Sequence, residues 1–249
     1  MQFIDLAKQQ SLIKTNLDKR IQDVLAHGKY IMGPEIKEME AQLAEYVGVK
    51  HCVSCSSGTD ALLMPLLAWD VGPGDAVFTT PFTFIATAEV IQLLGATPIF
   101  VDIDPKTYNI SPELLDDAIT EVIEKGELNP KVIIPVDLFG LPADYAAIEL
   151  ISKKYDIKIL EDAAQGFGGQ IDDRLAGSFG DAASTSFFPA KPLGCYGDGG
   201  AIFTDDDELY EKLVSVRVHG KGGDKYDNVR IGLNGRMDTL QAAIVLEKF

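Results

Sequence analysis

A lysine flanked by prolines ends a short apolar stretch in the segment 184–194, which reads STSFFPAKPLG. An amine in an apolar turn is costly to desolvate, and this cost lowers its pKa toward the neutral form that attacks carbonyl groups. We therefore interpret Lys191 as a lysine that forms Schiff bases. The alternative, which the turn alone favours, is a solvated lysine that happens to follow a strand.

Two further polar residues stand at the ends of predicted strands. The segment 159–166, ILEDAAQG, is a hydrophobic strand that delivers Asp162 to its carboxyl end, and Ser186 ends the strand before Lys191. A carboxylate can keep a heteroaromatic nitrogen protonated, a hydroxyl can bind a phosphate, and an amine can react with an aldehyde. Pyridoxal 5'-phosphate needs this set of groups, so the three residues predict a site for that cofactor.

A fourth segment, 57–60, reads SGTD and joins a predicted strand to the start of a helix. Free backbone N–H groups and the helix dipole favour an anion at such a junction. The alternative interpretation is an ordinary Ser or Thr helix cap, which these residue types also form.

The elements that must position these residues alternate along the chain. We expect strands at 51–55, 76–80, 97–102, 132–136, 158–161 and 201–204, and helices at 58–69, 84–94, 111–120, 144–155 and 206–216. Repeated strand–helix units predict a mostly parallel sheet covered by helices on both faces. Ligands bind beyond the carboxyl ends of the strands in such sheets, and the polar residues singled out above stand there. Further amphipathic helices are predicted at 5–27, 34–47 and 237–249.

Composition and charge exclude several classes of protein. A chain of 249 residues that is 46% hydrophobic can bury the core of one large α/β domain or two smaller ones. Its net charge of −16 repels phosphate backbones and anionic membranes, so we expect neither a nucleic-acid nor a membrane partner. The sequence shows no leader pattern and no apolar run of bilayer length, which predicts a cytoplasmic protein.

The cysteines raise the question of a metal or redox site. Cys52 and Cys55 form a Cys-x-x-Cys pair beside His51, but there is no second pair, and the remaining cysteine, Cys195, stands alone. We expect buried strand packing at these positions and no metal.

Together these motifs resemble the DegT/DnrJ/EryC1/StrS family of sugar-nucleotide aminotransferases that depend on pyridoxal phosphate. The resemblance covers nearly the whole chain, with further motifs at 3–6 (FIDL), 56–62 (SSGTDAL), 81–84 (PFTF) and 232–237 (GLNGRM). It implies the α/β fold type I of pyridoxal-phosphate transferases, like aspartate aminotransferase. Its domains would be an N-terminal helix at 1–30, a large cofactor domain at 31–236, and at 237–249 the start of a helix leading to a small C-terminal domain that this chain lacks.

The resemblance also assigns roles around the cofactor. Lys191 would be its covalent anchor and the general acid and base of the reaction. Asp162 would pair with the pyridine nitrogen, while Glu161 points the other way because neighbours on a strand face opposite sides. The remaining cofactor contacts are the phosphate ligands Gly58, Thr59 and Ser186, the aromatic Phe82 stacked on the ring, Gln165 near the phenolic oxygen, and Asn234. Phe84 is expected in the core.

The Asn234 contact would cross a two-fold interface to the cofactor phosphate of the partner subunit, which makes the protein a homodimer with shared active sites. A turn is the usual place of an asparagine between two glycines, as in this sequence. The residues implied for the sugar nucleotide are His219, Tyr226, Arg230 and Arg236.

The function implied is transfer of an amino group from an amino acid, preferably glutamate, to a keto-sugar nucleotide for surface polysaccharide or related glycan biosynthesis. The preferred substrate is a UDP-linked 3-keto-N-acetylhexosuronic acid, and amination at C4 is the alternative. Sugar dehydratases of the family replace the lysine with histidine, so Lys191 argues against that chemistry. A non-catalytic sensor that binds the cofactor or a sugar nucleotide is the alternative from another class, and the complete set of Asp162, Ser186 and Lys191 argues against it.

Overall fold

The structure is a computed structural model that describes residues 4–224 and 226–249. Phe3 of the first family motif and Lys225 of the loop after His219 lie outside the described residues. Within these ranges no helix is long and apolar enough to cross a lipid bilayer.

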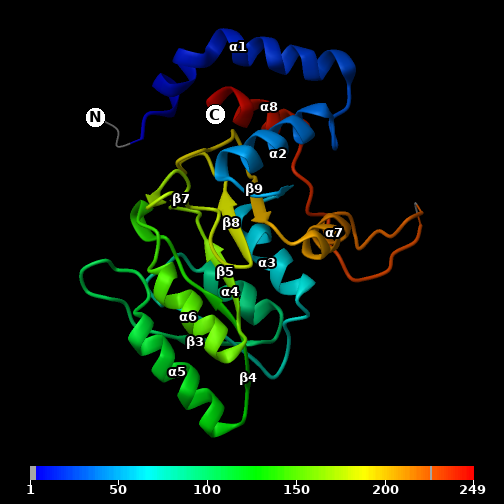
Figure 1. The fold of residues 1–249 in the computed structure, drawn as a ribbon. Coiled ribbons are helices and arrows are strands. Elements are labelled where there is room, and N and C mark those ends of the chain that lie inside the picture. Colours follow the sequence, from blue (N-terminus) through cyan, green and yellow to red (C-terminus); the bar gives the residue numbers. More distant parts are fainter. Residues whose placement is uncertain (1–3, 225) are drawn as a thin grey trace.

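A seven-stranded sheet runs through the centre of the molecule (Figure 1), in the strand order β1-β9-β8-β5-β4-β2-β3. The strands span His51–Cys55 (β1), Asp75–Thr79 (β2), Thr97–Phe100 (β3), Asn129–Ile134 (β4), Lys158–Asp162 (β5), Ala182–Ser186 (β8) and Gly200–Thr204 (β9). The pairs β2–β3, β2–β4, β4–β5 and β5–β8 are parallel, and only β9 runs against its neighbours β1 and β8. The predicted mostly parallel α/β sheet is therefore confirmed.

The helices lie on both faces of this sheet. They span Leu6–His27 (α1), Pro34–Val47 (α2), Gly58–Ala68 (α3), Ala86–Leu93 (α4), Pro112–Lys125 (α5), Tyr145–Tyr155 (α6), Asp207–Val216 (α7) and Thr239–Lys248 (α8). A 3₁₀ turn at Leu138–Gly140 (η1) and a small hairpin of Gln170–Ile171 (β6) with Arg174–Leu175 (β7) complete the described elements. Neither η1 nor the hairpin was predicted, because elements of two or three residues are too short to show a hydrophobic pattern.

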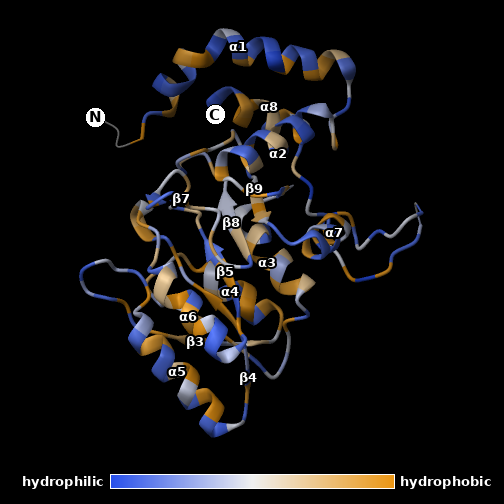
Figure 2. Cartoon of the chain, in the orientation of Figure 1, coloured by the Kyte–Doolittle hydropathy of each residue, from blue (hydrophilic) through white to orange (hydrophobic). Residues whose placement is uncertain are grey.

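Successive side chains of a strand point to opposite faces of the sheet, and the core on these two faces consists of three hydrophobic clusters. Helices α3, α4 and α7 pack on the face that Val53, Val77 and Leu160 present. On the other face, α2 and α8 cover one end of the sheet, and α5 and α6 cover the other. Figure 2 shows the result, with hydrophobic residues on the strands and polar residues along the outer sides of α1 and α5.

The two cysteines of the Cys-x-x-Cys pair are buried in strand β1, as expected. Cys52 contributes to the cluster under α2 and α8, whereas Cys55 contributes to the cluster under α3. Residues three apart on a strand face opposite sides, so the two thiols point into different cores. Burial raises the pKa of both thiols, which makes them unreactive packing residues.

The ends of the described chain meet at one end of the molecule. Helix α1 lies against α8, and both stand over α2 in Figure 1. Arg20 of α1 donates hydrogen bonds to Glu38 of α2 and to Glu247 of α8, which ties the three helices together. The expected domain limits at 30/31 and 236/237 stay a prediction.

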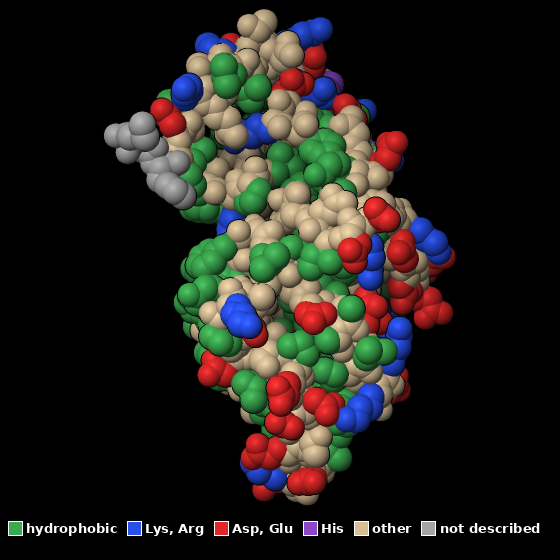
Figure 3. Space-filling view, turned by 60° about the vertical axis from the view of Figure 1, so that its left-hand side comes forward, with side chains coloured by type: hydrophobic (Ala, Val, Ile, Leu, Met, Phe, Trp, Pro, Cys, Tyr) green, Lys and Arg blue, Asp and Glu red, His purple; other side chains and the backbone are tan. Residues whose placement is uncertain are grey.

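The acidic surplus is visible on the surface. Figure 3 shows Asp and Glu side chains over the lower part of one face and apolar side chains nearer its middle. The net charge of −16 thus lies largely at the surface, where water and salt screen it.

We expect Phe203→Ala in β9 to lower the free energy of unfolding by about 3–5 kcal/mol, because it leaves a cavity between α2 and the sheet. Phe203 is 1% exposed, whereas Leu150 on the outer side of α6 is 69% exposed. The control Leu150→Ala should change stability by less than about 0.5 kcal/mol. Urea unfolding followed by circular dichroism measures both, and equal losses would contradict this account of the core.

Candidate active site

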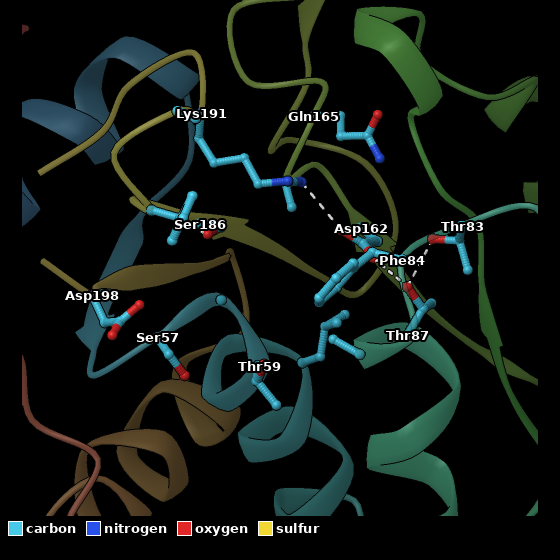
Figure 4. Close-up of a pocket in the computed structure, with 16 residues that line it drawn as sticks. Ser57, Thr59, Thr83, Phe84, Thr87, Asp162, Gln165, Ser186, Lys191 and Asp198 are labelled. Atoms are coloured by element: carbon cyan, nitrogen blue, oxygen red, sulfur yellow. Dashed lines mark hydrogen bonds between the residues drawn. The ribbon is translucent and has the colours of Figure 1, made fainter. Parts of the chain in front are cut away.

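A cavity of about 500 Å³ opens at the carboxyl ends of β5 and β8, as predicted for a parallel sheet. Four segments distant in sequence line it (Figure 4): the turn into α3, the start of α4, the end of β5 and the segment between β8 and β9. The lining residues are Ser57, Gly58, Thr59, Leu62, Thr83, Phe84, Ala86, Thr87, Asp162, Ala164, Gln165, Ser186, Phe188, Ala190, Lys191 and Asp198. Six of the predicted site residues are therefore brought together.

Lys191 lies in a connection whose two ends are bound to the sheet. Its backbone N–H donates to the carbonyl of Phe188 at 2.8 Å, and the N–H of Cys195 donates to the carbonyl of Phe187 at 2.7 Å. Gly194 is needed at this turn, since an added Cβ would lie 2.6 Å from the carbonyl oxygen of Pro189. The half-buried Lys191 side chain extends from this turn into the cavity, toward Asp162 (Figure 4).

Asp162 ends the central strand β5 and is 4% exposed. Its Oδ2 accepts a hydrogen bond from the Thr87 hydroxyl at 2.9 Å, and its Oδ1 accepts one from the Ala164 N–H at 3.2 Å. Burial raises the pKa of Asp162, while the two hydrogen bonds and the positive charge of Lys191 oppose this rise. The cavity therefore contains an amine and a buried carboxyl group that influence each other.

The third feature of the cavity is the N-terminus of α3 beside the end of β8. Ser57 caps the helix, its Oγ accepting from the Asp60 N–H at 3.1 Å. A Cβ on Gly58 would lie 2.6 Å from the Cβ of Ser186, so only glycine allows the helix to start this close to the strand. The first N–H groups of the helix and the Ser186 hydroxyl consequently face one space, which suits a phosphate.

Comparison with known proteins agrees with this geometry. The model of the DegT/DnrJ/EryC1/StrS aminotransferase family matches residues 11–249. The chain belongs to this family. The membership predicted from the sequence motifs is thereby confirmed.

The chain is also similar in sequence and structure to individual aminotransferases of this family. The chain is 52% identical, over its whole length, to the UDP-2-acetamido-2-deoxy-3-oxo-D-glucuronate aminotransferase of Pseudomonas aeruginosa, of which it covers 67%. It superposes on a DegT DnrJ EryC1 StrS aminotransferase from Brucella abortus with a TM-score of 0.99 and 56% identity, covering all of this chain and 66% of the other. The NtdA structure of Bacillus subtilis, with bound cofactor PMP, gives a TM-score of 0.91 at 35% identity, covering all of this chain and 55% of that one.

The chain thus spans only about two thirds of the first two of these family members and just over half of the third. The fold of the shared part is the fold type I that was predicted.

Phe84, and not Phe82, stands in the lining of the cavity. Phe84 was expected in the core, but it is 65% exposed and lines the cavity, whereas Phe82 is absent from the lining. The chain turns after β2, where the Thr80 hydroxyl accepts from the Phe82 N–H. The ring of Phe82 then packs against those of Tyr108 and Phe139, at centroid distances of 5.8 and 6.2 Å. Phe84, just before α4, is therefore the aromatic residue of this segment that lines the cavity, and the stacking role expected of Phe82 stays a prediction.

The residues predicted for the sugar nucleotide lie outside this cavity. His219, Tyr226 and Arg230 are exposed on the segment after α7. Asn234 is also exposed, and its side-chain oxygen accepts from the half-buried Arg236 at 2.5 Å. None of them lines the cavity of its own chain, so their roles stay predictions.

Sequence reasoning missed the polar residues Thr83, Thr87 and Asp198, which also line the cavity. A threonine near a helix start and an aspartate between glycines are too common to be a signal by themselves. Gln165 lines the cavity, with its Oε1 accepting from the Phe139 N–H at 3.2 Å, and its place near the phenolic oxygen of the cofactor stays a prediction.

A pair of buried acids lies behind the cavity. Glu161 faces away from Asp162, as predicted, and accepts from the N–H groups of Gly177 and Phe179 at 2.6 and 2.8 Å. Asp137 lies beside it, accepting from the Tyr145 hydroxyl at 2.9 Å. Burial raises the pKa of Asp137 to about 6, and burial together with the charge of Asp137 raises the pKa of Glu161.

This pair should make stability depend on pH. A carboxyl whose pKa is raised on folding binds its proton more tightly in the folded protein, so its contribution is lost as pH rises through the folded value. Asp137→Asn replaces the Oδ2 that accepts no hydrogen bond among the described residues with an N–H₂ group beside Glu161. The variant should therefore gain stability relative to the wild type as pH rises through about 6.

Urea unfolding of both proteins between pH 4 and pH 8 measures this relative change. The exposed Asp117 supplies the control, since Asp117→Asn should follow the wild type at every pH. A constant difference between wild type and Asp137→Asn over the whole range would rule out the raised pKa.

Proposed function

We propose that the protein is a pyridoxal-phosphate-dependent aminotransferase, which moves an amino group from an amino acid, preferably glutamate, to a keto-sugar nucleotide. The observation that carries the proposal is the convergence of Lys191, Asp162 and the start of α3 on one cavity of about 500 Å³. An amine, a buried carboxyl and an anion site are the groups that the aldehyde, ring nitrogen and phosphate of this cofactor require. The residues present therefore fit it.

Each residue of the cavity has a task in this reaction. Gly58, Thr59 and Ser186 bind the phosphate, and Phe84 covers the ring. When bound, the cofactor supplies a carbonyl that reacts with amines and a ring that stores an electron pair. Asp162 holds the proton on the ring nitrogen.

Lys191 has two roles. Its Nζ would hold the resting cofactor covalently. Once released, it would move a proton from the Cα of the amino donor to the bound cofactor, and in the second half of the reaction from the cofactor to the keto carbon of the acceptor. Leu62, Phe84 and Phe188 give the lining apolar side chains, which would shield part of this proton transfer from water once the ligands are bound.

The acceptor that we favour is a UDP-linked 3-keto-N-acetylhexosuronic acid. Support comes from the Pseudomonas aeruginosa aminotransferase at 52% identity, whose name specifies a 3-oxo-glucuronate substrate. Arg230 and Arg236 are the cations that we assign to the carboxylate of the sugar. Amine transfer to C3-keto and to C4-keto sugar nucleotides, compared side by side, separates this substrate from the C4 alternative. We place the activity in the cytoplasm, in surface polysaccharide or related glycan biosynthesis.

With pyridoxal phosphate added, the purified protein should turn yellow and lose its long-wavelength absorption band when glutamate follows. Borohydride should fix the cofactor to Lys191, as peptide mass spectrometry would show. Lys191→Ala should lower turnover by several orders of magnitude, about 5 kcal/mol or more of barrier, whereas Lys153→Ala on the outer helix α6 should not. A saturated protein whose spectrum no amino donor changes would be a sensor rather than an enzyme.

We also propose that the protein acts as a homodimer in which Asn234 contacts the cofactor phosphate of the partner subunit. Asn234 is exposed and does not line the cavity of its own chain, which is the arrangement that a shared site requires. Binding of the cofactor would then stabilise the dimer over the monomer.

Mixing Lys191→Ala chains with Asn234→Ala chains tests the shared site. In a mixed dimer both lesions fall in one site, and the other site carries neither. Random exchange makes half of the dimers mixed, so activity should recover to about a quarter of the wild-type value. Each variant alone is the control, and no recovery after demonstrated subunit exchange would place Asn234 in its own subunit's site or in a simple turn.

A further inference from the structure

Two hydroxyl groups of the cavity lining form a chain of hydrogen bonds that ends on the carboxyl of Asp162 (Figure 4). The Oγ1 atoms of Thr83 and Thr87 are 2.9 Å apart, and Thr87 Oγ1 donates to Asp162 Oδ2 at 2.9 Å. Thr87 is 1% exposed and Asp162 4% exposed, so bulk water does not replace these bonds. Neither threonine was assigned a role by the sequence analysis or by the reaction described above.

The direction of this chain follows from the acceptor at its end. An ionised carboxylate has no hydrogen to give, so the Thr87 hydroxyl must point its hydrogen at Asp162. Thr87 Oγ1 can then accept a hydrogen bond from the Thr83 hydroxyl. With the Ala164 N–H on Oδ1, both oxygens of Asp162 have a fixed donor, and the plane of the carboxylate is set.

The charges around Asp162 oppose one another. Burial disfavours the ionised form of Asp162, and Lys191 on the cavity side favours it. Asp137 lies on the opposite side with Glu161 and Tyr145, and its charge and that of Asp162 repel each other. The Thr87 hydroxyl is the largest of the influences that favour the charged form. A donor at this place therefore favours the ionised form of the buried carboxyl.

We propose that Thr87 is a positioning residue that orients Asp162 and keeps it ionised, and that Thr83 strengthens this effect by donating to Thr87. The inference rests on the proposed function, because the ionised Asp162 matters to the reaction only as the partner of a protonated ring nitrogen. It adds to that function a control over the carboxylate by two residues that act through Asp162.

The substitutions that test it are Thr87→Val, which keeps the shape but removes the hydroxyl, and Thr87→Ser, which restores the hydroxyl without the methyl group. Thr120→Val on the exposed side of α5 is the control for exchanging a threonine hydroxyl for a methyl. Carbon-13 NMR of the aspartate carboxyl groups in the cofactor-free protein, assigned with Asp162→Asn, reads the titration of Asp162 directly. Equilibrium dialysis with pyridoxal phosphate at pH 7 reads its affinity.

Thr87→Val should raise the titration midpoint of Asp162 by about one pH unit and weaken cofactor binding about tenfold. Thr87→Ser should return both quantities to within about twofold of wild type, and Thr120→Val should change neither. An unchanged midpoint in Thr87→Val would overturn the proposal, as would a Thr87→Ser protein that behaves like Thr87→Val.

Should Thr87→Val fail to fold, Thr83→Val decides the question. It should shift the midpoint in the same direction by a smaller amount, and an unchanged midpoint there would count against the chain of hydroxyl groups. The role of Thr87 and the proposed function can be disproved independently of each other. A wild-type protein that does not bind pyridoxal phosphate would overturn the proposed function, while the NMR midpoints still report whether Thr87 controls Asp162.

Discussion

The burial of one carboxylate at the end of the central strand determines which hydrogen-bond donors and charges must surround it. Asp162 is 4% exposed, and an ion removed from water must be compensated by fixed donors and charges. The helix start of α4 supplies the Thr87 hydroxyl, the chain after β5 supplies the Ala164 N–H, and the lysine-bearing turn supplies the positive charge. These elements are far apart in sequence, so the fold assembles the site by the same contacts that make the buried charge tolerable.

The neighbouring acid on the same strand lies in a different environment, against a second carboxyl instead of a lysine. Glu161 has two backbone donors but also the carboxyl of Asp137 beside it, and its pKa is raised. Strand alternation thus separates a carboxyl available to a ligand from a pair that favours a bound proton. Gly166 lies directly against this pair, since an added Cβ would stand 2.4 Å from the Cβ of Asp137. The pair therefore also fixes the backbone that carries Gln165.

Much of this site could be predicted because its signals are local. Lys191 lies between prolines, Asp162 ends an apolar strand, and Gly58 begins a helix after a strand. The few residues on either side are therefore enough to identify each of them. Phe82 and Phe84 could not be told apart in this way. Both follow the same strand, and which ring faces the cavity depends on how Thr80 turns the backbone. The sequence did not indicate a role for Thr87, because its hydrogen-bond partner, Asp162, lies 75 positions away.

The segment implied in sugar binding is tied to the anion site through the backbone. The buried Arg217 donates to Glu40 and to the carbonyl of Ser54, which anchors the chain after α7 to α2 and β1. The Gly235 N–H then donates to the Arg217 carbonyl, and the Ser56 N–H donates to the Gly235 carbonyl at 3.0 Å. Ser56 immediately precedes the cap of α3. These hydrogen bonds join the segment around Asn234 to the start of α3, so the sites that we propose for the sugar and for the cofactor phosphate would share one set of hydrogen bonds.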